Sequence, residues 1–143
     1  MIHDFDYEQY PSLADHVWRG MELLRRRGWP EPVVRAVGAH ASYTGIAPEA
    51  PVERAIVAAD ELSGFVGACA LVRPSRSVRD LPPESVVKKM KDKAFARAVS
   101  REDIIKGAAE LGVDLDEHIA FCIEAMKPIA NELGLDGSAA RSA

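Results

Sequence analysis

The sequence has little of several features that define common protein classes. It has two cysteines among 143 residues. Both Cys69 and Cys122 lie within apolar helical patterns, which predicts buried free thiols rather than a disulfide or a zinc knuckle. No apolar run is as long as a membrane-spanning helix. Residues 1–10 are acidic and lack the apolar segment of a signal peptide. We therefore expect a cytoplasmic protein with no membrane partner.

The sequence also lacks an excess of positive charge. Its formal net charge is -4, which gives no overall reason to expect a nucleic-acid partner. A phosphate-cradling glycine loop and a nucleophile-elbow pattern are both absent from the sequence. Hydrophobic residues make up 48% and charged residues 28% of the chain, as in ordinary globular proteins. The length fits one domain with a single core.

The hydrophobic pattern is that of helices. Apolar positions recur every three or four residues, and no strand signal is longer than a few residues. Two helix starts carry a further local signal. Ser100 with Asp103 and Asp114 with Glu117 both resemble capping boxes. The predicted helices are residues 12–27, 32–40, 52–72, 84–99, 101–111 and 115–134.

These helices predict an all-α bundle of about five to six helices. The helix over residues 52–72 is apolar on nearly all sides, which makes it the expected core helix. Pro128 is expected to bend the last helix. We predict a single domain over residues 1–135 and a disordered tail over residues 136–143.

A metal-binding pattern opens the chain. His3 is followed directly by Asp4, and Asp6 lies two residues further on. This is the mixture of imidazole nitrogen and carboxylate oxygen that a water-activating divalent cation prefers. Three of the four histidines fall within the first forty residues: His3, His16 and His40. The fourth, His118, has polar neighbours and is expected to be exposed.

Asp60 lies in the middle of the apolar core helix, where a carboxylate is costly unless it is paired or binds a metal. In one interpretation it faces solvent or pairs with Arg54 or a nearby lysine. In the other it faces inward and meets His3 and Asp4, so that a metal gains three protein ligands and water fills the remaining positions. The adjacent Glu61 points elsewhere on the helix and is expected at the surface.

Several stretches together resemble the HD-domain metal-dependent phosphohydrolases, and most of all the small bacterial HDIG-type hydrolases. The resemblance covers about residues 1–135. It is carried by His3-Asp4, by His16 in Ala14-Asp15-His16, by His40 in Ala36-Val37-Gly38-Ala39-His40, by Asp60 in Ala58-Ala59-Asp60-Glu61-Leu62, and by the runs at residues 70–75 and 88–96.

The resemblance implies a role for each of these residues. His3 and Asp4 are the implied paired metal ligands and Asp60 the last ligand. His16 and His40 match positions that bind a second metal or the substrate phosphate. The implied cofactor is a divalent ion, one of Mn, Fe, Co, Ni, Zn or Mg, and the implied substrate is a small phosphate ester such as a nucleotide. The metal would activate a water for attack on phosphorus, and Asp4 would also orient that water.

The sequence departs from the family in two ways. Family members carry a further histidine ligand on helices that precede the His-Asp pair, and here the pair begins two residues after Met1. Many relatives also have a histidine where this chain has Ala41, which argues against a full two-metal site. The pair is followed by Phe5-Asp6 rather than Ile-Gly, and the sequence has no Gly-Tyr-Pro run. Both facts argue against a cyclic-dinucleotide phosphodiesterase.

The absence of those helices would leave apolar surface uncovered. We therefore expect a homodimer or a helix-exchanged oligomer. The alternative to an enzyme is a degenerate, non-catalytic HD scaffold that serves as a dimeric helical interaction module.

A basic stretch over residues 73–97 contrasts with the acidic chain. Arg73, Lys88 and Lys91 are the residues expected to attract an anionic substrate. The other interpretation is a solvated helix face with lysine–aspartate pairs along it. Tyr43, in the loop after His40, lines a pocket in one interpretation and covers the core in the other.

Overall fold

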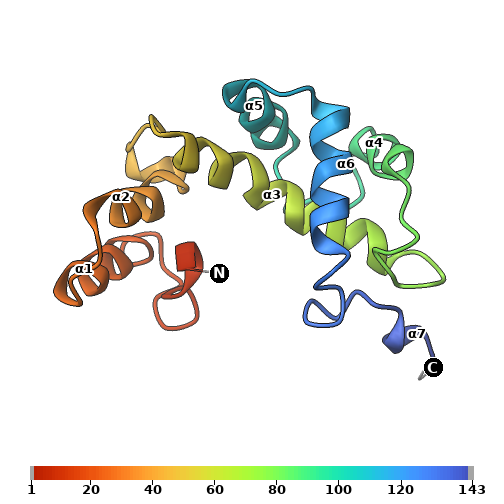
Figure 1. The fold of residues 1–143 in the computed structure, drawn as a ribbon, viewed down its shortest axis with the longest axis horizontal. Helices are drawn as coiled ribbons and strands as arrows, with labels where there is room; N and C mark the ends of the chain where they lie inside the picture. The colour runs from red at the N-terminus through yellow and green to blue at the C-terminus, as the bar shows by residue number, and fades with distance from the viewer. Residues whose placement is uncertain (1, 142–143) are drawn as a thin grey trace. The chain divides into compact units, whose positions relative to one another are not determined.

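The computed structural model describes residues 2–141 (Figure 1). The predicted all-α class is confirmed, since this part of the chain forms helices and no strand. The elements are η1 (Ile2–Asp4), α1 (Trp18–Arg26), α2 (Glu31–Ala39), η2 (Ser42–Thr44), α3 (Pro51–Leu71), α4 (Pro83–Met90), α5 (Arg101–Leu111), α6 (Leu115–Met126) and α7 (Ser138–Arg141), where η denotes a 3-10 helix. None of the helices within residues 2–141 has both the length and the apolar character needed to cross a membrane.

Two compact units make up the chain, Met1–Val57 and Ala58–Ala143. The single domain predicted over residues 1–135 stays a prediction. Within the tail predicted to be disordered, Ser138–Arg141 form helix α7. Residues 142–143 of that tail lie outside the described residues.

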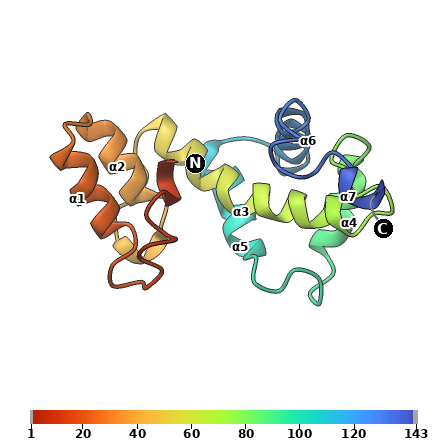
Figure 2. The same cartoon turned by 90° about the horizontal axis from the view of Figure 1, so that it is seen from below.

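In the first unit, α1 and α2 pack side by side (Figure 2). The apolar positions of α1 are spaced by four and three residues, so they share one face of the helix. The buried cluster between the helices consists of Val17, Met21, Leu24, Val34, Val37 and Ala41. Gly28, at φ +73°, lies just past the end of α1, where a left-handed residue ends a helix with least strain.

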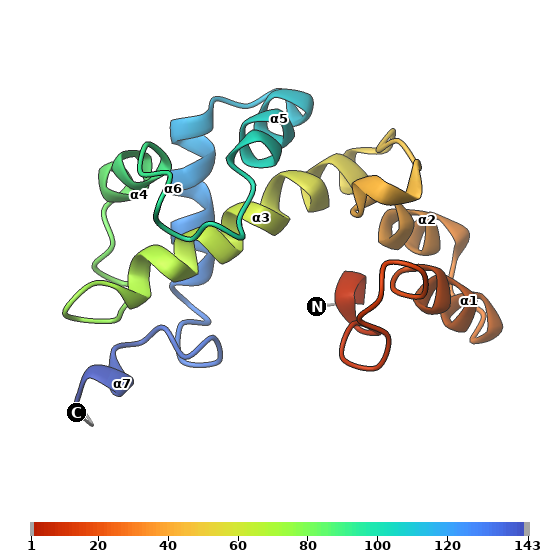
Figure 3. The ribbon, with the colours of Figure 1, turned by 180° about the vertical axis from the view of Figure 1, so that it is seen from behind.

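In the second unit, α4, α5 and α6 gather around α3 (Figure 3). The buried apolar side chains at its centre include Leu62, Phe65, Val66, Val86, Ile104, Ile119 and Ile123. Phe65 also meets the ring of Phe95 edge to face, with centroids 5.6 Å apart. Burial of these groups from water supplies the main stabilisation of this unit.

The helix predicted over residues 84–99 is wrong in its second half. Helix α4 ends at Met90, and residues 91–99 form turns. There the Asp92 carboxylate accepts hydrogen bonds from the backbone N–H groups of Ala94 and Phe95. The Arg101 guanidinium donates to nearby backbone carbonyls as well. Side chains thus satisfy backbone groups that a longer helix would have paired internally.

The ends of two other predicted helices also differ. Helix α1 begins at Trp18 rather than near residue 12, because Val17 has the non-helical dihedrals φ +66° and ψ -49°. Helix α6 ends at Met126 instead of continuing through Pro128. Proline has no N–H to donate and clashes with the preceding turn, so the helix stops there rather than bending.

Candidate metal centre

Four predicted site residues converge in the first unit: His3, Asp4, His16 and His40. His3 and Asp4 lie on η1, which packs against α2 (Figure 2). His16 lies in the turn before α1, and His40 is the C-terminal capping residue of α2. The histidine side chains are buried, whereas the Asp4 side chain is 46% exposed. The cluster is therefore buried on the side of its histidines and open to solvent at Asp4.

Asp4 is the centre of the cluster. Its Oδ1 lies 3.3 Å from Nε2 of His16 and 3.2 Å from Nε2 of His40. Its Oδ2 lies 3.2 Å from Nε2 of His3. The ligand atoms of Asp4, His16 and His40 all lie within 4.8 Å of one another. One cation can therefore contact an oxygen and two nitrogens at once.

The tautomer of His40 is set by the backbone carbonyl of Val37. Its Nδ1 lies 2.6 Å from the carbonyl oxygen of Val37. A carbonyl only accepts, so Nδ1 carries the proton and the neutral ring turns the lone pair of Nε2 towards Asp4. Two acceptors at 3.2 Å repel each other unless a proton or a cation lies between them. The residues present thus fit a bound cation.

A second carboxylate, Asp6, lies behind His16 and is 2% exposed. Its oxygens lie 3.1 Å from Nδ1 of His16, 3.1 Å from the N–H of Val17 and 2.9 Å from the N–H of Gly20. A Cβ on Gly20 would come within 2.9 Å of the Asp6 carboxyl carbon. Glycine is therefore needed for this close approach of backbone to carboxylate.

The sequence shows Asp6 as one acidic residue near His3 and does not predict this position. The buried contacts of Asp6 join it to residues ten or more positions later. The signal available in the sequence is Gly20 inside a helix, where glycine often marks a close approach of another group.

Val17 holds a strained conformation beside His16. Its side chain is fully buried and its φ of +66° is rare for a β-branched residue. Such a conformation costs about 1–3 kcal/mol and persists where the surroundings enforce it. Here the N–H of Val17 donates to the Asp6 carboxylate. The turn that places His16 in the cluster is thus held by a hydrogen bond to a buried charge.

Two tyrosines lie close to the cluster. The ring of Tyr7 meets the ring of His16 edge to face at 5.0 Å. Burial raises the pKa of Tyr43, and the negative charges of Asp6 and Asp4 raise it further. Tyr43 therefore remains a protonated hydroxyl at neutral pH, able to donate a hydrogen bond.

Asp60, the predicted last ligand, is half-buried on α3 in the second unit. Its backbone carbonyl accepts a hydrogen bond from the Ser63 hydroxyl at 2.9 Å. Its role as a metal ligand stays a prediction.

The expectation that Glu61 lies at the surface is wrong, because Glu61 is half-buried and accepts a hydrogen bond from the N–H of Ser100. Burial also raises the pKa of the Glu61 carboxyl.

The residues expected to attract an anion lie in the second unit. Arg73 forms an ion pair with Asp80 at 3.5 Å. Lys88 and Lys91 are exposed at the end of α4. Their role towards a substrate stays a prediction.

The expectation that His118 is exposed is wrong. His118 is 7% exposed, and its Nε2 lies 3.0 Å from the backbone carbonyl oxygen of Ala58. Both cysteines are buried free thiols, as predicted. Burial raises the pKa of Cys69 to about 11, so this thiol is not poised for nucleophilic chemistry.

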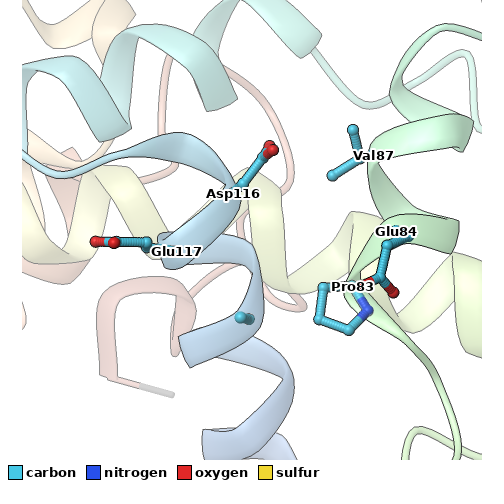
Figure 4. A pocket seen from close by; sticks show the side chains of 6 residues that line it. Pro83, Glu84, Val87, Asp116 and Glu117 are labelled. Carbon is cyan, nitrogen blue, oxygen red and sulfur yellow. The ribbon is translucent and has the colours of Figure 1, made fainter.

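A shallow pocket lies between α4 and α6 of the second unit (Figure 4). Its apolar lining comes from Pro83, Val87 and Ala120, and its acidic lining from Glu84, Asp116 and Glu117. No histidine or cysteine lines this pocket. The histidine–aspartate cluster of the first unit is therefore the better candidate for metal chemistry.

Comparisons of the chain with protein-family models, with curated proteins and with solved structures found no match.

Proposed function

We propose that the first unit binds a divalent cation through Asp4, His16 and His40, with His3 beside them, and hydrolyses a small phosphate ester such as a nucleotide. One observation supports this above all. Two imidazole Nε2 atoms approach the same Asp4 oxygen, at 3.3 and 3.2 Å, and the other nitrogen of His40 is already engaged by a carbonyl. A cation between these atoms turns a repulsive arrangement into an attractive one.

The cation, Asp4 and Tyr43 have different roles in the proposed reaction. A divalent cation held here would lower the pKa of a water and polarise a phosphoryl oxygen. Asp4 is the cluster member that also reaches solvent, so its carboxylate can accept a hydrogen bond from the attacking water. The protonated Tyr43 hydroxyl is a donor for a phosphate oxygen. Imidazole and carboxylate ligands suit several first-row metals and do not select among Mn, Fe, Co, Ni and Zn.

The first test is metal content followed by phosphatase activity. We expect the purified protein to bind Co²⁺, and to hydrolyse p-nitrophenyl phosphate or a nucleoside monophosphate when Mn²⁺, Co²⁺, Ni²⁺ or Mg²⁺ is added. His40→Ala should weaken Co²⁺ binding and abolish hydrolysis, because it removes one of two converging nitrogens. The matched control is His118→Gln, which removes a buried imidazole of the second unit.

Two outcomes would contradict the proposal. If the native protein takes up no cation, a proton rather than a metal balances Asp4. If His118→Gln weakens Co²⁺ binding as much as His40→Ala, the assignment of the site is wrong. Asp60→Ala belongs in the same series, because unchanged Co²⁺ binding in that variant would remove Asp60 from the predicted ligands.

The second candidate function is a non-catalytic, dimeric interaction module. It is supported by large apolar side chains that are exposed in the first unit, namely Ile2, Phe5, Leu13 and Trp18. Large apolar side chains that are exposed to water are available for a contact with another protein. Co²⁺ binding without hydrolysis of any phosphate ester, together with a dimer in sedimentation equilibrium, would favour this candidate over the enzyme.

A further inference from the structure

We infer that Asp6 is a positioning residue that fixes the tautomer of His16 and thereby turns the Nε2 lone pair of His16 towards Asp4. The inference deepens the proposed function and rests on it for the identity of the cation. The tautomer itself is a property of the metal-free protein and can be measured without any cation.

The two oxygens of Asp6 have separate partners. Oδ1 lies 3.1 Å from Nδ1 of His16, and Oδ2 accepts the N–H groups of Val17 and Gly20 at 3.1 and 2.9 Å. The carboxylate is 2% exposed, so water does not compete for these contacts. An ionised carboxylate only accepts hydrogen bonds. The proton of a neutral His16 ring therefore resides on Nδ1, and Nε2 carries the lone pair.

The same tautomer is imposed on His40 by a different acceptor. Nδ1 of His40 donates to the carbonyl of Val37, and Nε2 faces Asp4. Two imidazoles are thus fixed independently, one by a carboxylate and one by a carbonyl, with the same nitrogen presented to the same oxygen. Acceptors of this kind behind a histidine orient it for a metal and raise its basicity.

His118 shows the contrast with a structural histidine of this chain. Its Nε2 is the atom that meets a backbone carbonyl, at 3.0 Å from the oxygen of Ala58. It presents no lone pair of Nε2 to a carboxylate. The arrangement at His16 and His40 therefore differs from that of His118, the buried histidine of the second unit.

Asp6→Asn separates the tautomer from the fold. The amide oxygen can replace Oδ2 and accept the N–H groups of Val17 and Gly20, which keeps the turn. The amide NH₂ then faces Nδ1 of His16 and donates to it. Nδ1 must accept, so the proton moves to Nε2, where it blocks a cation. The variant keeps the shape of the side chain at position 6, and the Nε2 lone pair of His16 is no longer available to a cation.

The measurement is a ¹⁵N–¹H correlation spectrum of the imidazole rings in metal-free protein, at a pH about two units above the ordinary imidazole pKa. We expect the native His16 and His40 rings to be protonated at Nδ1. In Asp6→Asn the proton of His16 should move to Nε2, while His40 stays unchanged as an internal control. A Co²⁺ titration should then show affinity weakened by about 10- to 100-fold, the usual effect of losing such a supporting group.

A second variant displaces Asp6 without changing its chemistry. In Gly20→Ala the new Cβ would lie 2.9 Å from the Asp6 carboxyl carbon, which pushes the carboxylate away from its partners. We expect weaker Co²⁺ binding here as well, with the native Asp6 present. The matched control is Glu53→Gln, because the Glu53 carboxylate is also buried and accepts the N–H groups of Glu49 and Ala50, yet pairs with Arg35 instead of a histidine.

The inference is overturned if native His16 carries its proton on Nε2, or if Asp6→Asn leaves the tautomer at Nδ1. It is also overturned if Glu53→Gln lowers Co²⁺ affinity as much as Asp6→Asn, since a general loss of stability would then explain both. A native Nδ1 proton that shifts in Asp6→Asn, in a protein that binds no Co²⁺, would support the positioning role and contradict the proposed function.

Discussion

At the scale of single residues, two buried carboxylates organise the first unit. Asp6 accepts two backbone N–H groups beside His16, and Glu53 accepts two beside Arg35. An ionised carboxylate is costly to bury unless such partners replace its water. Both residues therefore depend on backbone N–H groups that point at them, from Val17 and Gly20 for Asp6 and from Glu49 and Ala50 for Glu53.

The first residue-scale prediction concerns Glu53 and acid. Burial raises the pKa of the Glu53 carboxyl, but hydrogen bonds from Ala50 and Glu49 and the charge of Arg35 lower it more, so the pKa lies below the ordinary value. The ionised form is thus favoured in the folded state. Its stabilisation is fully present above the ordinary glutamate pKa and is lost as the pH falls through the lowered value.

We expect Glu53→Gln to lower the free energy of unfolding by about 1–3 kcal/mol at neutral pH, because Arg35 loses its charged partner. The variant should also lose less stability than the native protein on acidification. Urea unfolding at a series of pH values measures both effects. An identical acid-side slope in the two proteins would show that Glu53 does not contribute to it.

At the scale of elements, the sequence predicted best the helices whose ends carry local signals. The range predicted for α5, 101–111, matches the structure. Its start is capped by the Ser100 hydroxyl, which accepts the N–H of Asp103 at 3.1 Å, and it ends at Gly112 with φ +79°. These signals lie within four residues of each helix end, so the sequence displays them directly.

The elements that the sequence missed depend on hydrogen bonds between side chains and the backbone. The apolar period of α4 continues to Phe95, yet the chain leaves the helix after Met90. The start of α1 is likewise moved to Trp18 by Val17 and its bond to Asp6. In both places a polar side chain outside the segment satisfies the backbone, and periodicity does not reveal that side chain.

The sequence also pointed to some residues of the candidate site and missed others. The residue types and their order pointed to the histidines that surround Asp4. Asp6 was missed because its role depends on burial and on backbone N–H groups in a turn. His118 was misjudged because Asp116 and Glu117 beside it are polar, whereas its own side of α6 faces the core.

The element-scale prediction concerns the turns at residues 91–99. The Arg101 guanidinium donates to the carbonyls of Ala96 and Val99 and lies 4.6 Å from the centre of the Phe65 ring. Arg101→Lys keeps the charge but not the forked donor geometry. We expect it to lower the free energy of unfolding by about 1–3 kcal/mol.

Hydrogen exchange should then rise over residues 91–100, and chemical denaturation measures the loss of stability. Arg97→Lys is the control, because Arg97 is exposed on the same stretch. Equal effects of the two substitutions would show that the carbonyl contacts of Arg101 do not hold these turns.

At the scale of the whole molecule, each unit has its own buried apolar cluster. The proposed ligands Asp4, His16 and His40 all belong to the first unit. A ligand that binds the folded state stabilises it by about 2.7 kcal/mol at a hundred times its dissociation constant. Local opening free energies differ between parts of one protein, so this gain need not be uniform.

We therefore expect Co²⁺ to slow amide hydrogen exchange most in α1 and α2 of the first unit, with little change in α5 and α6 of the second. Mass spectrometry of peptides after exchange, with and without Co²⁺, measures the difference. The cluster variant His40→Ala should remove the protection. Uniform protection of all helices would contradict a site supported by the first unit alone.

The carboxyl-terminal stretch after α6 returns to the loop that follows α3. The N–H of Val78 donates to the carbonyl of Leu135 at 2.9 Å, and Leu135 itself is buried. A practical consequence concerns protein engineering. An affinity tag or a fluorescent fusion is best appended beyond Asp136. Truncation before Leu135 would remove a buried side chain from the core and expose apolar surface that promotes aggregation.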